Sequence, residues 1–470
     1  MGTSAEILIS RIRKRQRFDA DYYRPENFYI EDTIRRQSAW TTLGSVARPL
    51  FSKGIFDIRA DEYVQHGVPF VRITNLRNGL IELDGITYLT AERSKKDQRT
   101  ELSQYDVVLS KTAYPAASLV QLPVCNVSQD IIAVKTNRDR KFNCFLVAFL
   151  NGRFGLPQMK RLFQGNIQSH LGLVEARDIL VPLPSEQFMT EIERLFLSAL
   201  THREMANILF VSGQRLLQDE LGFEGVDFSP RKAYETGLAK ICRSRRWDSE
   251  FYKPKYMQAM DAVLKAKKIK LERFIPTGRL VSYITNGHTP LHHDLTIGDI
   301  LFLTAEHVTD FQLDFATDKR ILRVHHETEL ARTALREEDI LVTIKGKVGN
   351  CAVVRNCPKA ANINQDVALI RLRNGTHPYF FAAWFNSPMG KQLVEQRSTG
   401  GINPFLGLGN LRGMPFPVVD PEEQQRIGDL VQDTIERAHS AEREAASLFE
   451  NAKRRIEELI EQGTATNGGA

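Results

Sequence analysis

Residues 405–409, Phe-Leu-Gly-Leu-Gly, satisfy the pattern F-x-G-x-G, which forms the loop by which methyltransferases hold S-adenosylmethionine. Residues 403–405, Asn-Pro-Phe, are similar to the Asn-Pro-Pro-aromatic motif that holds a flipped adenine. The two patterns overlap at Phe405, whereas a methyltransferase fold separates them by several strands, and the second proline is missing. The related stretch 171–174, Leu-Gly-Leu-Val, also lacks the second glycine. We therefore expect no methyl transfer by this chain.

A second group of residues has the composition of a nuclease site, in which carboxylates and a lysine act together. Asp130 and Lys135, with Asp366 at the matching place later in the chain, supply these groups. Their spacing lacks the Glu-x-Lys pair of such sites, and Arg371 stands where a second lysine would be needed. We interpret these residues as the ends of β-strands.

Two histidine-rich stretches could bind a metal ion: His292-His293-Asp294 and His325-His326-Glu327. Adjacent residues of a strand point to opposite faces, and no third ligand follows at a suitable spacing, which favours solvated loops. The sequence also contains no G-x-x-x-x-G-K-[ST] phosphate loop, so any use of ATP must lie in another chain. We predict no metal and no cofactor in this chain.

The composition is that of an ordinary globular protein, since 42% of the 470 residues are hydrophobic and 26% are charged. The 63 Lys and Arg residues exceed the 57 Asp and Glu residues, and the net charge of +6 permits a nucleic-acid partner without requiring one. No run approaches the ~18 apolar residues of a membrane span. The five cysteines include no CxxC pair, which argues against a disulfide framework or zinc ribbon. We expect a cytoplasmic protein.

The most informative feature of the sequence is an internal repeat. Residues 18–25, Phe-Asp-Ala-Asp-Tyr-Tyr-Arg-Pro, recur 229 residues later as Trp-Asp-Ser-Glu-Phe-Tyr-Lys-Pro. Residues 126–131, Asn-Val-Ser-Gln-Asp-Ile, recur 236 residues later as Asn-Ile-Asn-Gln-Asp-Val, and Leu-Gly-Leu at 171–173 recurs after 235. The spacing between matching stretches changes by only a few residues, which small insertions in loops explain. Two homologous units of about 235 residues therefore fill the chain.

Each unit has the same internal order: a basic and aromatic segment, a stretch of short β-rich runs, a proline-rich exit and a long helix. Asp420, Pro421 and Glu423 form a capping-box start for the second helix. Both helices carry mostly small and apolar residues at alternating spacings of three and four, which predicts pairing as an antiparallel coiled coil. These residues are Ile192, Leu195, Ala199, His202, Ala206, Leu209, Gly213 and Leu216, and Ala438, Ala441, Ala445, Leu448 and Ala452.

The length of the first helix suggests a use for the duplication. A helix over 188–218 would span roughly 45 to 50 Å at ~1.5 Å per residue, which exceeds one turn of duplex DNA, ~34 Å. If the β-rich units sit at opposite ends of the helices, related by an approximate twofold axis, each could read a short DNA site. Unread base pairs would lie between the two sites, and the helix length would act as a ruler.

This organisation resembles the specificity (S) subunit of Type I restriction-modification systems over essentially the whole chain. Such subunits have two target-recognition domains, each followed by a long helical region with a proline-rich entrance, here 181–187 and 416–424. In the second unit, residues 339–349, Asp-Ile-Leu-Val-Thr-Ile-Lys-Gly-Lys-Val-Gly, are similar to the strand, glycine-containing loop and strand of these domains. The matching stretch 110–115, Ser-Lys-Thr-Ala-Tyr-Pro, lacks the glycines.

The resemblance implies a mixed α+β, non-catalytic DNA-recognition subunit that serves phage defence. It would bind double-stranded DNA and two adenine-N6 methyltransferase subunits that use S-adenosylmethionine. An ATP-dependent nuclease and translocase subunit, using ATP and Mg²⁺, could join them. The implied domains are a first target-recognition domain (1–184), a central helix (185–222), a linker with the second target-recognition domain (223–419), a C-terminal helix (420–462) and a flexible tail (463–470).

Base edges are distinguished by donor and acceptor patterns that polar and basic side chains match, so such residues in loops between short strands are candidates for reading DNA. The candidates for DNA reading in the first unit are Arg72, Asn75, Lys111, Thr112, Gln129, Asn166 and Gln168. Those in the second unit are Thr304, His307, Lys345, Lys347, Gln365, Arg397 and Asn403. Gln129 and Gln365, at the same repeat position, could equally cap a strand. The basic runs 11–17 and 243–246 suit phosphates or an acidic partner surface better than bases.

Two alternatives stay open from the sequence. The chain could be the specificity subunit of a Type IIB-like or other phage-defence methyltransferase complex, which only methylates or cuts with a different effector. It could also be a coiled-coil assembly protein whose β domains bind protein rather than DNA.

Overall fold

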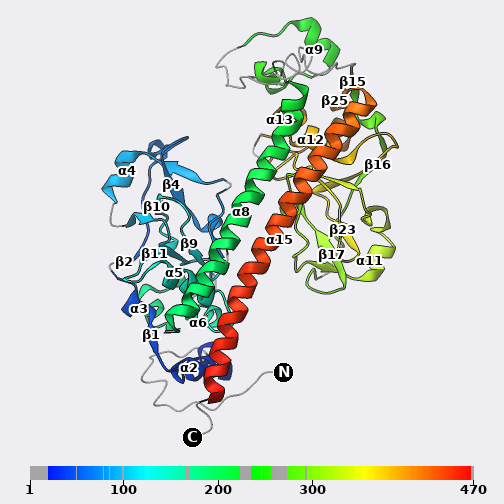
Figure 1. Cartoon of the computed structure of the whole chain (residues 1–470). Helices are drawn as coiled ribbons and strands as arrows, with labels where there is room; N and C mark the ends of the chain where they lie inside the picture. The colour runs from blue at the N-terminus through cyan, green and yellow to red at the C-terminus, as the bar shows by residue number, and fades with distance from the viewer. Residues whose placement is uncertain are drawn as a thin grey trace. The chain divides into compact units, whose positions relative to one another are not determined.

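The computed structural model describes residues 20–48, 50–77, 79–83, 85–97, 100–164, 170–222, 234–244, 246–256, 258, 273–291, 294–401 and 403–466. The described chain is a mixed α+β protein with two compact units (Figure 1). The first unit comprises Met1–Glu204 and Ala441–Ala470, and the second comprises Met205–Ser440. Each unit therefore contains one β-rich region and a stretch of each of two long helices.

The first unit is built on two five-stranded sheets. One has the order β2 (Leu50–Lys53), β11 (Ile131–Lys135), β8 (Val107–Ser110), β9 (Ala117–Leu119), β5 (Gly79–Leu80). The other has the order β3 (Tyr63–Val64), β6 (Thr87–Leu89), β4 (Val68–Val71), β10 (Val124–Val127), β7 (Leu102–Ser103). Two short pairs complete the unit: β1 (Trp40–Thr42) with β14 (Leu180–Pro182), and β12 (Phe163–Gln164) with β13 (His170–Leu171).

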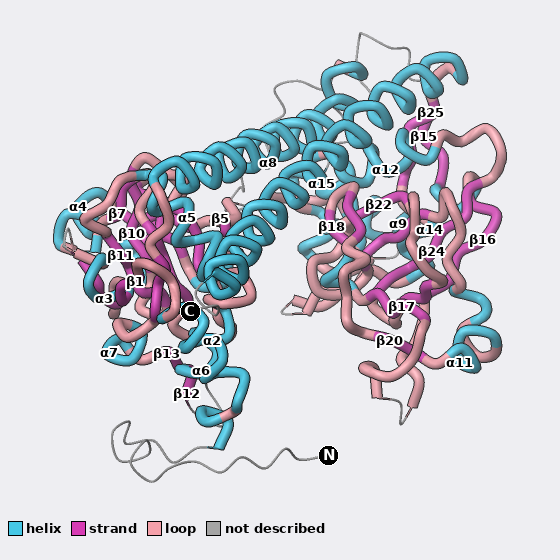
Figure 2. The backbone as a smooth tube through the Cα atoms, turned by 60° about the horizontal axis from the view of Figure 1, so that its bottom comes forward, coloured by secondary structure: helices cyan, strands magenta, loops and turns pink. Residues whose placement is uncertain are grey.

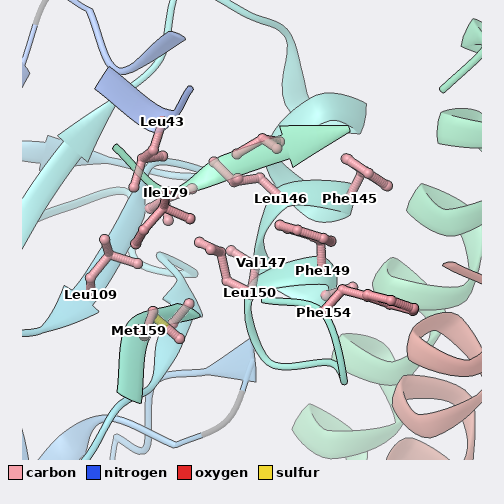
Figure 3. Packing of buried hydrophobic residues seen from close by; sticks show 14 of the residues in the cluster. Leu43, Leu109, Phe145, Leu146, Val147, Phe149, Leu150, Phe154, Met159 and Ile179 are labelled. Atoms are coloured by element: carbon pink, nitrogen blue, oxygen red, sulfur yellow. The ribbon is translucent and has the colours of Figure 1, made fainter. Parts of the chain in front are cut away.

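Helix α5 (Arg140–Leu150) supplies much of the core of the first unit. It begins because the carboxylate of Asp139 accepts a hydrogen bond from the backbone N–H of Phe142 at 3.1 Å. Its side chains Phe145, Leu146, Phe149 and Leu150 are buried in the cluster drawn in Figure 3. The other helices of the unit are η1 (Ala20–Tyr23), α2 (Pro25–Arg35), α3 (Leu43–Val46), η2 (Ala60–Glu62), η3 (Ile73–Asn75), α4 (Ala91–Lys96), α6 (Leu156–Leu162) and α7 (Leu173–Ala176).

Among the described residues, the second unit repeats this arrangement with fewer strands. Figure 2 draws the strands in magenta. Its sheets have the orders β16 (Val281–Asn286), β24 (Val367–Leu372), β21 (Ile340–Thr343), β22 (Cys351–Val353), and β20 (Arg320–Ile321), β17 (Ile300–Leu303), β23 (Ala361–Ile363). The short pairs are β15 (Arg273–Pro276) with β25 (Pro415–Val418), and β18 (Val308–Thr309) with β19 (Gln312–Leu313). The helices are α9 (Leu238–Ser244), η5 (Ser249–Tyr252), η6 (Thr277–Arg279), η7 (Ala305–His307), α11 (Arg323–Glu327), η8 (Ala331–Thr333), α12 (Pro378–Asn386), α13 (Pro388–Arg397) and α14 (Leu408–Arg412).

Strand register confirms the duplication. The parallel pair β4–β10 places Asn126 opposite Phe70, and the parallel pair β17–β23 places Asn362 opposite Phe302. A glycine marks the same close approach in both units. A Cβ atom on Gly54 would lie 2.1 Å from the carbonyl oxygen of Val127, and one on Gly287 would lie 1.7 Å from that of Ile363.

An asparagine amide also holds the same strand in each unit. Asn151 accepts from the N–H of Ala117 at 3.2 Å and donates to its carbonyl oxygen at 2.7 Å. Asn386 does the same to Cys351 at 3.0 and 2.7 Å. Because Ala117 begins β9 and Cys351 begins β22, these bonds fix the starts of equivalent strands in the two units. β9 is flanked by β5, whereas β22 is the outermost strand of its sheet.

The long helices are α8 (Glu186–Leu221) and α15 (Pro421–Thr466), and they run antiparallel within each unit. In the first unit, Glu191 binds Arg455 at 2.9 Å, and further along α8 the ring of Phe196 packs against that of Phe449. The second unit has the same antiparallel order, with the partners Phe210–His439 and then Glu220–Arg426 at 2.7 Å. The predicted antiparallel pairing is thus confirmed.

Small residues let the helix backbones approach one another, as the spacing predicts. A Cβ atom on Gly213 would lie 2.5 Å from Cδ1 of Ile435, and Ala438 is fully buried. Residues 463–466 of the expected tail belong to α15, because that helix continues to Thr466, and 467–470 lie outside the described residues. None of the helices described is both long and apolar enough to cross a membrane. The domain division made from the sequence stays a prediction.

Candidate nucleic-acid interface

The loop after β21 in the second unit is a tight, internally bonded turn that presents two lysines. The hydroxyl of Thr343 donates to the carbonyl of Lys347 at 2.5 Å and accepts from the N–H of Asn350 at 2.9 Å. Gly346 and Gly349 have φ values of +76° and +92°, a region that favours glycine. Lys345 and Lys347, on either side of Gly346, are exposed. The predicted glycine-containing loop is therefore present in the structure.

The first unit forms the equivalent turn after β8 without glycine. The hydroxyl of Ser110 accepts from the N–H of Ala116 at 2.8 Å, as Thr343 does from Asn350. Ala113 takes the place of Gly346 and has a φ value of +64°. A left-handed alanine costs energy that the surrounding hydrogen bonds must offset. The missing glycines therefore do not abolish this loop.

A second loop lies against the first in both units. Thr112 forms a β-bridge with His170, and Lys345 forms one with Phe405. The backbone N–H of the following residue, Leu171 or Leu406, donates to the strand-end carbonyl at 2.8 or 2.9 Å. Two chain segments about 60 residues apart in sequence thus meet at one corner of each unit. We define this corner in each unit as the loop corner; its described residues are 110–116 with 163–164 and 170–171, and 343–350 with 398–401 and 403–407.

Lys345 occupies the centre of the second loop corner. Its ammonium lies 3.6 Å from a carboxylate oxygen of Asp366 and 5.7 Å from the centroid of the Phe405 ring, and half of its side chain is exposed. The carboxylate is held in place by Asn364, whose amide donates to it at 2.9 Å. An exposed ion pair of this kind contributes little stability and can exchange for another anion.

The two glutamines at the shared repeat position differ in their contacts. Gln129 is exposed, and within the described part of the chain no side-chain partner is recorded for it. The amide oxygen of Gln365 accepts from the hydroxyl of Thr289 at 2.9 Å, and Gln365 is half-buried. Gln129 is therefore available to a ligand, whereas Gln365 would have to exchange a bond.

Arg397 ends α13 at the foot of the second loop corner. Its guanidinium donates to the side-chain oxygen of Gln396 at 2.8 Å and is half-buried. Burial, and to a smaller extent the positive charge of Arg246, lowers the pKa of Arg397 to about 10. The side chain therefore stays protonated at neutral pH and carries a charge whose hydration is incomplete. Asn403 is exposed on the same loop.

Asn75 and His307 brace backbone rather than face solvent. The Asn75 amide oxygen accepts from the N–H of Arg72 at 3.0 Å, and Nδ1 of His307 accepts from the N–H of Thr304 at 2.9 Å. Only 3% and 8% of these residues are exposed. Arg72 itself is exposed. The buried pair fixes the turn that follows each central parallel strand, so it could affect DNA only by positioning its neighbours.

Burial also sets the protonation of His307. Desolvation lowers its pKa and outweighs the opposite effect of the neighbouring carboxylates Glu306 and Asp314. The lowered pKa agrees with the hydrogen bond, because only a neutral imidazole can accept at Nδ1.

Several predicted residues lie outside the described residues. They are Asn166 and Gln168, the basic run 11–17, and His292 and His293. Of the 243–246 run, the side chain of Arg246 is described, and it forms an ion pair with Asp248 at 2.8 Å.

The residues considered for catalysis have structural partners instead. Lys135 pairs with Asp106 at 3.8 Å, and at the equivalent place Arg371 pairs with Asp339 at 2.8 Å. Both ion pairs join neighbouring antiparallel strands. Burial raises the pKa of Asp106, and the charge of Lys135 opposes that shift.

The histidines of the second stretch also have local partners. His325 contacts the carboxylate of Glu329, which His288 contacts as well, at 2.5 and 2.9 Å. Among the residues that the structure describes, no group of three or more His, Cys, Asp or Glu side chains is arranged to hold a metal ion.

Three residues in or next to the loop corners were not predicted from the sequence. The hydroxyl of Tyr114 donates to the carbonyls of Ile73 and Leu76 at 3.2 and 2.8 Å, which joins the first loop to the turn after β4. Asn350 and Lys391 join the corresponding parts of the second unit. No repeat signal marks them, because the two units anchor their loops with different residues. Asn151 and Asn386 do recur after 235 residues, and the repeat could have revealed them.

The chain is similar to a known specificity subunit. It is 28% identical over 211 residues to the Type I restriction enzyme EcoBI specificity subunit of Escherichia coli. The match covers 42% of this chain and 43% of that protein, so it spans less than half the length of the relative. It confirms the resemblance predicted from the repeat. No protein-family model matches the chain.

Solved structures of the same kind of protein are also similar. The S subunit of a Type-I restriction-modification system from M. genitalium matches 89% of this chain and 96% of its own, with 12% identity and a TM-score of 0.38. The HsdS subunit from Thermoanaerobacter tengcongensis matches 90% of this chain and 96% of its own, with 13% identity and a TM-score of 0.28.

Proposed function

We propose that this chain is the DNA sequence-recognition subunit of a Type I restriction-modification complex. Each unit reads one half of a bipartite, asymmetric target in double-stranded DNA. The observation that carries the proposal is the pair of equivalent loop corners. Equivalent strands and backbone hydrogen bonds form both corners, but their polar side chains differ. The similarity to a specificity subunit supports it.

The different side chains at equivalent positions of the two loop corners would make the two half-sites differ. Lys111 and Thr112 occupy the places that Ile344 and Lys345 occupy in the second unit, and Arg72 occupies the place of Thr304. Arg and Lys side chains suit the acceptors of guanine, whereas threonine can donate or accept. Two surfaces with different donors and acceptors select different bases.

The exposed candidates are proposed to contact DNA directly, and the buried ones to position them. The first group contains Arg72, Gln129, Lys345, Lys347 and Asn403. A further five, partly covered, would contribute from the rim of the corner: Lys111, Thr112, Thr304, Gln365 and Arg397. Asn75 and His307 hold backbone in place.

The chemistry of the complex is proposed to reside in other subunits. Adenine-N6 methyltransferase subunits, two in number, would use S-adenosylmethionine, and a nuclease and translocase subunit would use ATP and Mg²⁺. The paired helices α8 and α15 would serve as the docking surface and as the spacer between half-sites. The chain itself is proposed to have no catalytic role.

The test is selection of bound sites from a random duplex library, with the full chain purified together with the subunits that accompany it from its own cells. We expect two short blocks of selected bases separated by a fixed run of unselected ones. A single uninterrupted block would contradict the bipartite target, and no enrichment would contradict DNA reading altogether.

A charge-matched pair of variants makes the result specific to the loop corner. Lys345→Ala combined with Lys347→Ala removes two exposed cations from the corner, and Arg332→Ala combined with Lys359→Ala removes two exposed cations elsewhere in the same unit. We expect the first pair to change the selected bases of one block. The second pair should change neither block.

A further inference from the structure

Lys391 of α13 lies against the base of the loop that carries Lys345 and Lys347. Its ammonium donates to the carbonyl oxygen of Gly349 at 2.9 Å and to the side-chain oxygen of Asn350 at 3.2 Å. It also binds the carboxylate of Asp310 at 2.5 Å. An ammonium has three donors, so these three contacts use all of them. Lys391 is therefore occupied by protein groups rather than available to DNA.

Asp310 is held in turn by the long helix α8. The amide of Gln214 donates to the second carboxylate oxygen of Asp310 at 3.2 Å. The neighbouring residue, Phe311, donates through its N–H to the carbonyl of Cys351 at 2.9 Å and accepts at its own carbonyl from His439 of α15 at 3.1 Å. The turn between β18 and β19 is thus fixed by both helices on one side and by Lys391 on the other.

Asn350 carries this constraint into the loop. Its backbone N–H donates to the hydroxyl of Thr343 at 2.9 Å, and its amide donates to the carbonyl of Val308 at 3.1 Å. The loop from 344 to 349 therefore follows directly after Thr343, whose hydroxyl binds the carbonyl of Lys347. It ends at Gly349, whose carbonyl binds Lys391. A loop closed in this way presents its exposed lysines in one geometry.

We propose that Lys391 is a positioning residue for DNA reading by the second unit, and that through Asp310 it ties the reading loop to the helix pair. The proposal rests on the proposed function and names the residue that sets the geometry of the second loop corner. Lys391 acts through the loop, and its side chain does not touch bases.

The environment of the ion pair gives it this role. The side chains of Lys391 and Asp310 are 29% and 22% exposed, so most of their water has been removed. Removing Lys391 would take away the ammonium that joins the partly buried carboxylate of Asp310 to the loop, which favours a rearrangement of the turn and loop. In the first unit, Leu156 stands at the position equivalent to Lys391, and Tyr114 anchors the loop instead.

The test compares Lys391→Met with wild type and with Lys391→Arg, each as the full chain with its accompanying subunits. Affinity is measured for the selected target and for targets in which one half-site at a time is scrambled. The half-site read by the second unit is the one whose selection changes in the Lys345→Ala variant. Thermal unfolding of each variant is measured in parallel.

Lys391→Met should lower affinity for the intact target about ten-fold, the size of one good base contact. Its affinity for DNA with the second half-site scrambled should equal that of wild type. Discrimination at the first half-site should not change, and Lys391→Arg should restore most of the loss, because its guanidinium keeps the positive charge.

Three results would overturn the proposal. The first is unchanged discrimination at the second half-site in Lys391→Met. The second is an equal loss at both half-sites together with a lower unfolding temperature, which would mark Lys391 as important for folding alone. In the third, wild type shows no preference for any target, so the proposed function fails and this inference fails with it.

Discussion

At the residue scale, the left-handed positions of the two loop corners make opposite predictions for the same substitution. Ala113 has a φ value of +64°, and its counterpart Gly346 has +76°, with no atom within 4 Å of a Cβ atom built there. An L-residue pays roughly 1–2 kcal/mol for this conformation. We expect Gly346→Ala to destabilise the protein by about 1 kcal/mol and Ala113→Gly to stabilise it by up to about 1 kcal/mol. Chemical unfolding of both variants measures the two signs, and equal signs would contradict the shared loop conformation.

The buried histidine of the second unit predicts a loss of stability in acid. Because the pKa of His307 is lowered by burial, the unfolded chain binds a proton more readily than the folded one. Stability is complete above the unfolded pKa, ~6.5, and is lost as the pH falls from there through the lowered folded pKa. His377, whose side chain is 8% exposed and whose pKa is also lowered by burial, contributes in the same direction.

The first unit suggests the variant that isolates His307. Asn75 stands at the equivalent position, makes the same bond to the backbone and does not titrate. We expect the unfolding temperature of His307→Asn to fall less between pH 7.5 and pH 5.5 than that of wild type. His170→Asn, at an exposed position, is the matched control and should fall as much as wild type. An equal fall for all three proteins would contradict this role for His307.

The sequence predicted parts of the site where a repeated pattern has a structural cause. The repeated Asn-x-x-Gln-Asp stretch recurs because Asn126 and Asn362 occupy the same place in a parallel strand pair. The sequence did not reveal that Asn75 and His307 are buried, since a turn of three residues leaves no periodic signal. Tyr114 and Lys391 were missed because each anchors only one unit.

At the element scale, α8 and α15 were predictable because their spacing is regular over many turns. Small residues at alternating intervals of three and four predict a close antiparallel pair, and Gly213 against Ile435 shows how close that packing becomes. The strands are shorter, with two to six residues each, and their order came from contacts distant in sequence rather than from local pattern.

The helix pair predicts how the gap in the target would change with its length. Removing one heptad from each helix shortens the spacer by ~10 Å and preserves the pattern of apolar residues. We expect the run of unselected bases to shrink by about three base pairs, since one turn of duplex spans ~34 Å. Removing four residues from α8 alone disturbs the heptads and is the comparison. Selection of bound sites measures the gap for both variants. An unaltered gap in the heptad variant would contradict the idea that helix length sets the distance between half-sites.

At the scale of the whole molecule, the duplication predicts that the two half-sites are read independently. Lys111 and Lys345 lie in different units and share no partner among the recorded contacts of the described residues. Free-energy changes at such sites add to within about 0.5 kcal/mol. We expect the double variant Lys111→Ala and Lys345→Ala to lose affinity by the product of the two single losses. Titrations of wild type, the two single variants and the double variant against one target measure this. Strong non-additivity of the free-energy changes would indicate one composite site.

The amide of Asn386 has a consequence for the whole chain in the cell. Strand β22 is the outermost strand of its four-stranded sheet, and an uncovered outer strand is a template on which another chain can add. Asn386 engages both the N–H and the carbonyl of Cys351 at that position, and the N–H of Phe311 donates to the same carbonyl. These backbone groups are therefore already paired where a foreign strand could otherwise bind, and we expect them to hinder aggregation through this edge.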